Sequence, residues 1–256
     1  MNRLEKLLIG SDMKVLITGH KGFIGRHVFA DWRRELGYAH VRGIDHPDCV
    51  SSFKGGDFDL VIHLAAWADI RESIASPDAY YINNVVKAKP LFDWCRETDT
   101  RLLYASSSAV DGNYWENPYA MSKWINEQMA PPNSVGMRFT TVYGPDTRDN
   151  MMYGLLRDKK ATYVTNHKRD WIHVQDVCRA IRVLAPSTLT GPVPIGYGES
   201  VPVKSLAEKF GQGDLPVKEF TPGEVDDNVA DISMMMSIGW VPMINILDTV
   251  QTDEDS

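Results

Sequence analysis

Short apolar runs alternate with amphipathic segments over the first half of the chain. Five apolar runs predict buried strands, at residues 14–18, 41–45, 60–64, 101–106 and 135–139. Between them, apolar side chains recur at helical spacing and predict helices over residues 22–36, 78–97 and 118–129. Because strands that alternate with helices are typical of a parallel sheet with helices on both faces, we predict an α/β fold with a doubly wound parallel sheet.

After Gly144, the alternation of apolar strands and amphipathic helices becomes less regular, because glycine and proline interrupt short strand and helix segments. One clear helix is predicted over residues 174–184. We therefore predict a sheet-bearing core at 13–145 and a mixed region at 146–252, which returns to the core near 171–185 and otherwise forms a small lobe. Residues 1–12 are expected to be an N-terminal extension, and residues 253–256 an acidic tail.

Composition narrows the class of protein. The 256 residues carry 27 Lys and Arg against 34 Asp and Glu, a net charge of −7, which argues against a nucleic-acid partner. No apolar run approaches the ~20 residues of a membrane span, so no membrane partner is expected. The three cysteines are widely spaced and form no metal motif or disulfide framework, which favours a reducing cytoplasmic location and no metal.

Three glycines lie between the first strand and the first helix. Gly19 would permit a tight turn, Gly22 would let backbone approach a pyrophosphate, and Gly25 would allow close packing of helix on strand. Asp45 follows at the end of the second strand, where it would accept hydrogen bonds from both ribose hydroxyls and repel a 2′-phosphate. The arrangement predicts a dinucleotide site that prefers NAD to NADP.

Tyr119 and Lys123 lie four residues apart and share a helix face. A free tyrosine has a pKa of about 10, and a nearby ammonium favours its phenolate form. Three serines at residues 106–108 end the strand that begins at Arg101, and active sites of open α/β sheets form at the carboxyl ends of strands. Together these residues predict a Ser–Tyr–Lys set for proton and hydride transfer at a hydroxyl-bearing carbon.

Several further motifs occur in a characteristic order. Taken together, the chain from about residue 14 to residue 242 resembles the extended short-chain dehydrogenase/reductases, the NAD-dependent epimerase/dehydratase family of nucleotide-sugar enzymes. The motifs that carry the resemblance are TGHKGFIG (18–25), HLAA (63–66), YASSSAV (104–110), NPYAMSK (117–123), RFTTVYGP (138–145), RDWIHVQDV (169–177) and GWVP (239–242).

This resemblance implies a Rossmann-type NAD-binding core and a small C-terminal substrate-binding lobe. It implies that Tyr119 is the acid/base, that Lys123 binds the nicotinamide ribose and lowers the tyrosine pKa, and that Ser108 is the catalytic hydroxyl. The residues that it implies for NAD binding are Gly19, Gly22, Phe23, Ile24, Gly25, Asp45, Leu64, Ala65, Ala66, Asn84, Ser106, Tyr119, Lys123 and Thr140. Those implied for a nucleoside-diphosphate sugar are Ser108, Tyr119, Thr141, Asn150 and Arg169. A homodimer through the helices near 78–97 and 118–130 is also implied.

The reaction type is suggested by what stands beside Ser108. The family's 4,6-dehydratases carry acidic residues there, whereas this chain has Ala109 and Val110. We therefore expect C4 epimerisation through a transient 4-keto sugar. The alternatives are an NAD(P)H-dependent nucleotide-ketosugar reductase and a non-catalytic dinucleotide-binding protein.

Two departures from the family pattern leave questions open. Asp111 stands where the family has an aromatic residue, and it is either structural or an added carboxylate near the site. The arginine that clamps the diphosphate in the family is missing from the segment at 221–228. Arg148, Lys159 and Lys160 are nearby cations that could compensate for it, although each by itself is more typical of a solvated surface charge than of a ligand.

Overall fold

The computed structural model describes residues 13–45, 50–218 and 227–250. The predicted N-terminal extension, the acidic tail and residues 221–226 of the segment that lacks the clamp arginine lie outside the described residues. Within the described residues, no helix combines the length and the apolar character that crossing a membrane requires.

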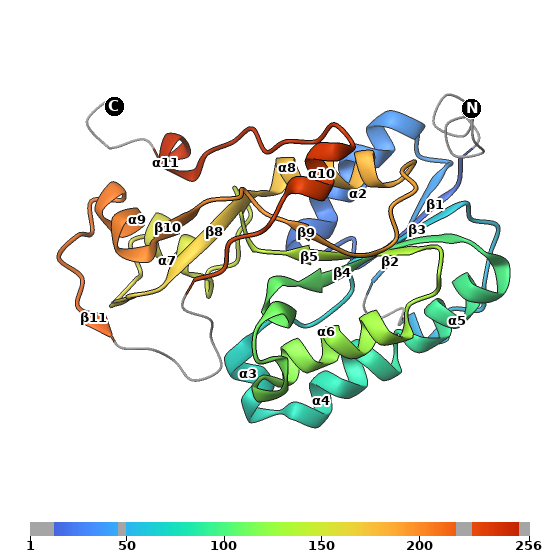
Figure 1. Cartoon of the computed structure of the whole chain (residues 1–256), viewed down its shortest axis with the longest axis horizontal. Coiled ribbons are helices and arrows are strands. Elements are labelled where there is room, and N and C mark those ends of the chain that lie inside the picture. The colour runs from blue at the N-terminus through green and yellow to red at the C-terminus, as the bar shows by residue number, and fades with distance from the viewer. Residues whose placement is uncertain (1–12, 46–49, 219–226, 251–256) are drawn as a thin grey trace.

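Six parallel strands form the central sheet, in the order β2-β1-β3-β4-β5-β9 (Figure 1). Their bounds are β1 Val15–Thr18, β2 Val41–Ile44, β3 Leu60–His63, β4 Arg101–Ser107, β5 Ser134–Phe139 and β9 Gly191–Ile195. The first five are the predicted strands, and the predicted doubly wound α/β fold is confirmed. The sixth was not predicted: Pro192 and Pro194 argue against a central strand, but β9 is an edge strand, where proline is tolerated.

Helices cover both faces of this sheet (Figure 1). On one face lie α2 (Phe23–Leu36) and α8 (Val174–Leu184), which share a buried apolar core with the sheet. On the other lie α5 (Lys89–Thr98) and α6 (Pro118–Met129), with α3 (Ile70–Ala75) and α4 (Pro77–Tyr81) beside them. The layers place the carboxyl ends of β1, β3, β4 and β5 at one edge, next to the start of α2 and α6.

The helix predicted over residues 78–97 is not continuous. It is divided into α4, a single π turn at Ile82–Val86, and α5, which has Pro90 in its first turn. Proline has no backbone N–H and clashes with the preceding turn of a helix, so it fits only where a helix begins. The single helix predicted over residues 78–97 is therefore divided, and Pro90 lies in the first turn of α5.

Helix α10 (Ser233–Ser237) packs on β9 and shares the core of the central sheet. The other remaining elements form a lobe beside the carboxyl edge of the sheet (Figure 1). Its small sheet has the order β10-β8-β6, and β7 pairs with β11. A separate apolar cluster that includes Tyr143, Trp171 and Leu206 fills this lobe. The bounds are β6 Thr141–Tyr143, α7 Met152–Arg157, β7 Val164–Thr165, β8 Lys168–His173, β10 Ser200–Pro202, α9 Val203–Lys209, β11 Val217–Lys218 and α11 Ile246–Thr249.

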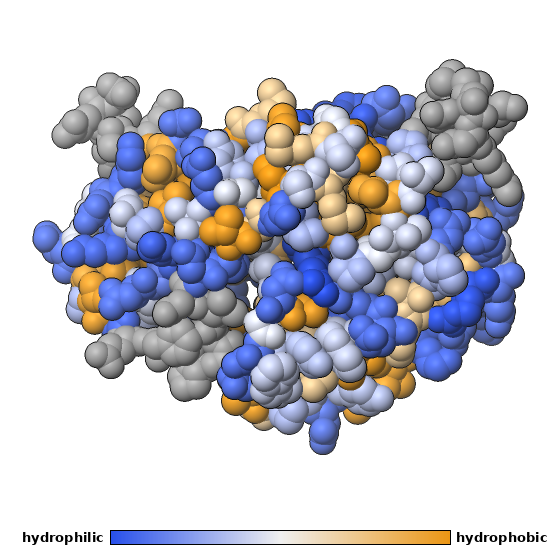
Figure 2. All heavy atoms as spheres, in the orientation of Figure 1, coloured by the Kyte–Doolittle hydropathy of each residue, from blue (hydrophilic) through white to orange (hydrophobic). Residues whose placement is uncertain are grey.

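Short 3-10 turns complete the chain at Val50–Ser52 (η1), Ser108–Asp111 (η3) and Tyr114–Glu116 (η4). Hydrophilic residues cover most of the face shown in Figure 2, with smaller apolar groups between them. Most of the long apolar side chains of the sheet and of the inner helix faces are instead buried in the clusters on either side of the sheet.

Candidate active site

A cleft of about 440 Å³ lies at the carboxyl edge of the central sheet, against the lobe. The glycine turn, the serines that end β4 and the first turns of α6 form one side, and residues from the lobe form the other. Most of the predicted site residues line it: Gly19, Gly22, Phe23, Ile24, Gly25, Leu64, Ala66, Ser106, Ser108, Tyr119, Lys123, Thr140, Thr141, Asn150 and Arg169. Asp45, Ala65 and Asn84 are absent from the described residues that line it.

The turn between β1 and α2 leaves no room for side chains at two of its glycines. Gly19 has φ of +73°, and a Cβ there would lie 2.6 Å from the Ala65 backbone nitrogen. A Cβ on Gly25 would lie 1.9 Å from the Gly19 carbonyl oxygen. Asp45 braces the same turn, because its carboxylate accepts a hydrogen bond from the Lys21 backbone N–H at 2.6 Å. This bare backbone at the start of a helix fits the pyrophosphate of a dinucleotide.

Helix α6 positions the tyrosine and the lysine. Asn117 caps it by accepting hydrogen bonds from the backbone N–H groups of Tyr119 and Ala120, at 3.0 and 3.2 Å. Tyr119 thus lies in the first turn, and Lys123 follows one turn later. The Lys123 ammonium donates to the Ala105 carbonyl oxygen at 2.9 Å, and burial lowers the pKa of this lysine to about 8.

Opposing influences act on the Tyr119 phenol. Burial raises the pKa of Tyr119, whereas a hydrogen bond with the Ser107 side chain and the positive charge of Arg148 lower it. The Lys123 ammonium lies 5.7 Å from the centre of the tyrosine ring. Neither Ser107 nor the effect of Arg148 on the phenol was predicted from the sequence; the predicted effect of Lys123 on this pKa stays a prediction.

The three adjacent serines have three different partners. The Ser106 hydroxyl donates to the buried Glu127 carboxylate at 2.6 Å. Ser107 bonds to Tyr119, as described, and its oxygen also accepts from the Ala109 backbone N–H at 3.2 Å. Ser108 accepts from the Asn228 side chain at 3.1 Å. All three line the cleft, but the Ser106 hydroxyl is engaged by the buried Glu127, and Ser107 is the serine whose hydrogen bond lowers the pKa of Tyr119.

Besides Ser106, two further residues predicted to bind the cofactor are hydrogen-bonded within the protein. The Asn84 side chain accepts from the Trp67 backbone N–H at 2.9 Å and donates to the Trp67 carbonyl oxygen and the Ser122 hydroxyl, both at 3.0 Å. Thr140 lines the cleft, but its hydroxyl donates to the buried Asp170 carboxylate at 3.2 Å. Their side chains hold neighbouring segments together, and their contacts with NAD stay predictions.

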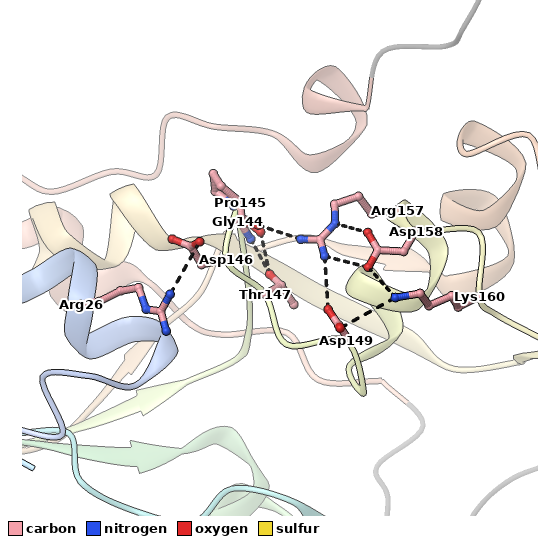
Figure 3. A network of polar contacts seen from close by, with 9 residues as sticks. All are labelled: Arg26, Gly144, Pro145, Asp146, Thr147, Asp149, Arg157, Asp158 and Lys160. Atoms are coloured by element: carbon pink, nitrogen blue, oxygen red, sulfur yellow. Dashed lines mark hydrogen bonds and ion pairs between the residues drawn. The ribbon is translucent and has the colours of Figure 1, made fainter. Parts of the chain in front are cut away.

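The loop after β6 carries Arg148 and Asn150 into the cleft. Figure 3 shows how it is braced from behind: the Arg157 guanidinium donates to the Pro145 carbonyl oxygen at 2.7 Å, and Thr147 and Gly144 are hydrogen-bonded to each other at 2.8 Å. The three cations considered as replacements for the clamp arginine, Arg148, Lys159 and Lys160, therefore differ in their position relative to the cleft. Only Arg148 lines the cleft.

Lys160 is instead occupied by acidic neighbours. Its ammonium lies 3.8 Å from the Asp149 carboxylate and 3.5 Å from that of Asp158 (Figure 3). Neither Lys159 nor Lys160 is among the described residues that line the cleft. Together with Arg148, the predicted Arg169 provides the positive charge on the lobe side of the cleft.

The open question about Asp111 is answered by its partner. Its carboxylate pairs with the Arg138 guanidinium, which also makes two hydrogen bonds to Glu127, at 2.8 and 2.6 Å. Asp111 is absent from the described residues that line the cleft. It is therefore structural, and we refer to Ser106, Asp111, Glu127 and Arg138 below as the Arg138 cluster.

Comparison with known proteins agrees with this geometry. A family model described as the NAD dependent epimerase/dehydratase family matches residues 15–194. The uncharacterized protein MJ1055 of Methanocaldococcus jannaschii is 30% identical over 91% of this chain and 92% of its own length. The solved UDP-glucose 4-epimerase of Thermotoga maritima has a TM-score of 0.81 at 19% identity, and the alignment covers 93% of this chain and 96% of that one. The NAD-dependent NDP-hexosamine 5,6-dehydratase TunA also has a TM-score of 0.81, at 22% identity and 93% and 95% coverage. An epimerase and a dehydratase thus share this fold equally well, and the chain belongs to the NAD-dependent epimerase/dehydratase family, as an enzyme that uses NAD.

Proposed function

We propose that the protein is an NAD-dependent nucleotide-sugar epimerase that acts at C4. The observation that carries the proposal is the content of the cleft, which Tyr119, Ser108 and Lys123 line together. By the family resemblance, Ala109 also takes a position where the 4,6-dehydratases carry an acid. Asp69 is the one carboxylate among the described lining residues. It caps α3 by accepting from the Glu72 backbone N–H at 3.0 Å. Among the described lining residues, the Ser–Tyr–Lys set can take up and return one proton, and the one carboxylate is engaged as a helix cap.

In this reaction, the Tyr119 phenolate would accept the proton of the C4 hydroxyl, and Ser108 would hydrogen-bond the same oxygen. Bound NAD would supply the hydride acceptor and donor for C4. Tyr119 then gives its proton back to the C4 oxygen. Protons and electrons balance over the cycle, because nothing is consumed and only the configuration at C4 changes.

Positive charge near the cleft supports a substrate with a diphosphate. Arg148 and Arg169 both line the lobe side, where they would face an anionic ligand. The net charge of −7 would otherwise repel such a ligand. These two arginines would compensate for the clamp arginine that the sequence lacks.

The test is incubation of the purified protein with UDP-glucose, UDP-galactose, their N-acetyl forms and the corresponding uronic acids. The proposal expects one pair to interconvert without consumption of added NADH, by protein that retains NAD through purification. A ketosugar reductase would instead release its cofactor and need stoichiometric NAD(P)H. Loss of water or CO₂ from the sugar would contradict the proposal, and a complete absence of conversion would favour a non-catalytic dinucleotide-binding role.

Replacing Arg148 with Gln is expected to raise the pKa of Tyr119, because the positive charge that favours the phenolate is lost. Since the phenolate is the active base, the acidic limb of the kcat/KM profile should move to higher pH, by roughly half a unit to one unit. The matched control is Lys160→Gln, which removes a cation outside the cleft and should leave the profile in place. An unchanged profile for Arg148→Gln would show that Arg148 does not act on the tyrosine.

We further propose that the enzyme is a homodimer through the α4 and π-turn surface. Ile82 and Val86 lie one turn apart there and are 49% and 47% exposed, which is unusual for large apolar side chains on adjacent turns. Ile82→Glu is expected to convert a dimer to a monomer in light-scattering measurements. Val217→Glu, which changes an exposed apolar residue of the lobe, is the control. A wild type that is monomeric at micromolar concentration would contradict this proposal.

A further inference from the structure

We propose that Asn228 is a positioning residue, which orients the Ser108 hydroxyl so that its proton points at the C4 oxygen of the sugar. The inference rests on the proposed function and adds a residue from the lobe to its machinery. Asn228 lies in the segment that precedes α10, and it lines the cleft together with Ser108. These two residues are 120 positions apart in the sequence.

The direction of the two hydrogen bonds follows from the chemistry of their partners. The Asp170 backbone N–H can only donate, so the side-chain atom that it meets at 3.2 Å must be the Asn228 oxygen. The amide nitrogen therefore faces Ser108 and donates to its Oγ at 3.1 Å. Because this nitrogen has no lone pair to offer, the Ser108 proton cannot point at Asn228 and is left to donate elsewhere.

Asp170, the hydrogen-bond partner of Asn228, is itself held in place by several hydrogen bonds. The Asp170 carboxylate is fully buried and accepts from the backbone N–H groups of Tyr197, Gly198 and Ala230, at 2.6, 3.0 and 3.0 Å. Ala230 is only two residues beyond Asn228, so the same carboxylate fixes the segment that carries the amide. The Asp170 carboxylate thus fixes the position of the segment that carries Asn228, and the Asp170 backbone N–H fixes the orientation of the Asn228 amide.

The other serines of the site do not provide this donor. Ser106 donates to Glu127, and Ser107 is bonded to Tyr119. The Ser107 oxygen also accepts, from the Ala109 backbone N–H, but its hydroxyl is engaged with Tyr119. Ser108 is the cleft serine whose oxygen accepts from a donor and whose proton has no acceptor among the described residues. Its proton would stabilise the C4 oxygen as that atom passes from hydroxyl to carbonyl, whereas an acceptor at position 228 would draw the proton away from the sugar.

The decisive variant is Asn228→Asp, which keeps the shape of the side chain and the oxygen that accepts from Asp170. It replaces the donor to Ser108 with an acceptor. We expect kcat to fall roughly tenfold to a hundredfold, with KM and NAD retention changed by less than about twofold. The value of kcat is taken from the plateau of the pH profile, so that an effect of the added charge on the Tyr119 pKa does not enter.

Asn245→Asp is the matched control. The Asn245 side chain has the same pattern, because it accepts from the Leu247 backbone N–H at 2.8 Å and donates to the Tyr197 hydroxyl at 3.2 Å. It is absent from the described residues that line the cleft. Its change to Asp is expected to leave kcat within about twofold of the wild type, because the altered donor acts on no group of the cleft.

Combining Asn228→Asp with Ser108→Ala separates positioning from a structural role. If Asn228 acts through Ser108, its change should have no further effect on kcat once the serine hydroxyl is gone. An equal fall in the Ser108→Ala background, or wild-type kcat in Asn228→Asp alone, would overturn the inference. A wild type that converts none of the six nucleotide sugars would instead overturn the proposed function itself, so the two failures are distinguishable.

Discussion

Replacing Tyr119 with Phe is expected to lower kcat by about 10²–10⁴-fold while leaving the binding of NAD and of the nucleotide sugar nearly unchanged. The phenol is the only group in the Ser–Tyr–Lys set that can accept the C4 proton, because Lys123 is held by the Ala105 carbonyl oxygen. The aromatic ring that remains in Phe keeps its packing in the first turn of α6. The loss should therefore appear in kcat rather than in KM, when rates are measured under saturating substrate.

A control for this result is Tyr114→Phe. The Tyr114 ring stacks on Trp124 with ring centres 4.9 Å apart, and it is absent from the described residues that line the cleft. Loss of that hydroxyl should leave kcat within about twofold. If Tyr119→Phe retained wild-type turnover, another group would have to be the base, and the assignment of the catalytic set would be wrong.

Replacing Arg138 with Met is expected to destabilise the folded protein by about 3–5 kcal/mol. The side chain of Glu127 is only 3% exposed, and Arg138 makes two hydrogen bonds to it. Without the guanidinium, a carboxylate would stay buried, and the Ser106 hydroxyl would be its one side-chain donor among the described residues. The Arg138 cluster joins β4, β5, η3 and α6, so its loss would loosen the elements that carry the serines and the tyrosine.

The double variant Arg138→Met, Glu127→Leu provides the control, since it removes both charges and should recover much of the stability in urea unfolding. The exposed pair of Lys89 and Asp93 gives a second comparison. Asp93→Asn should cost no more than about 1 kcal/mol, because surface ion pairs contribute little. An Arg138→Met variant as stable as Asp93→Asn would show that the cluster does not stabilise the fold.

Local patterns were sufficient to predict much of the fold. The strands of the first half and helices α6 and α8 have a strong periodicity, and Pro118 and Asn117 mark the start of α6. β9 was missed because its two prolines resemble a loop, although an edge strand tolerates them. The division of the predicted 78–97 helix depends on the π turn at Ile82–Val86, for which apolar spacing gives no signal.

Within the site, the sequence was informative where the partners are close in the chain. The glycine turn and the spacing of Tyr119 and Lys123 are local, and the structure brings these residues into one cleft. The parts that were not predicted depend on long-range contacts. Asn228 meets Ser108 across 120 residues, and the charge of Arg148, on the loop after β6, lowers the pKa of Tyr119. In the sequence, an asparagine or an arginine by itself does not indicate a distant partner. The fold brings Asn228 to Ser108 and Arg148 to the same cleft as Tyr119.

The central claim is that a hydride leaves C4 of a nucleotide sugar and returns to the same carbon within one site. The most direct test is proton NMR of the reaction in D₂O, with the UDP-sugar that the wild type converts and no added NADH. We expect the C4 epimer with ordinary hydrogen at C4 and at its neighbouring carbons, because the hydride never exchanges with solvent. Deuterium on a ring carbon, a product that has lost water, or turnover that requires stoichiometric NADH would contradict it.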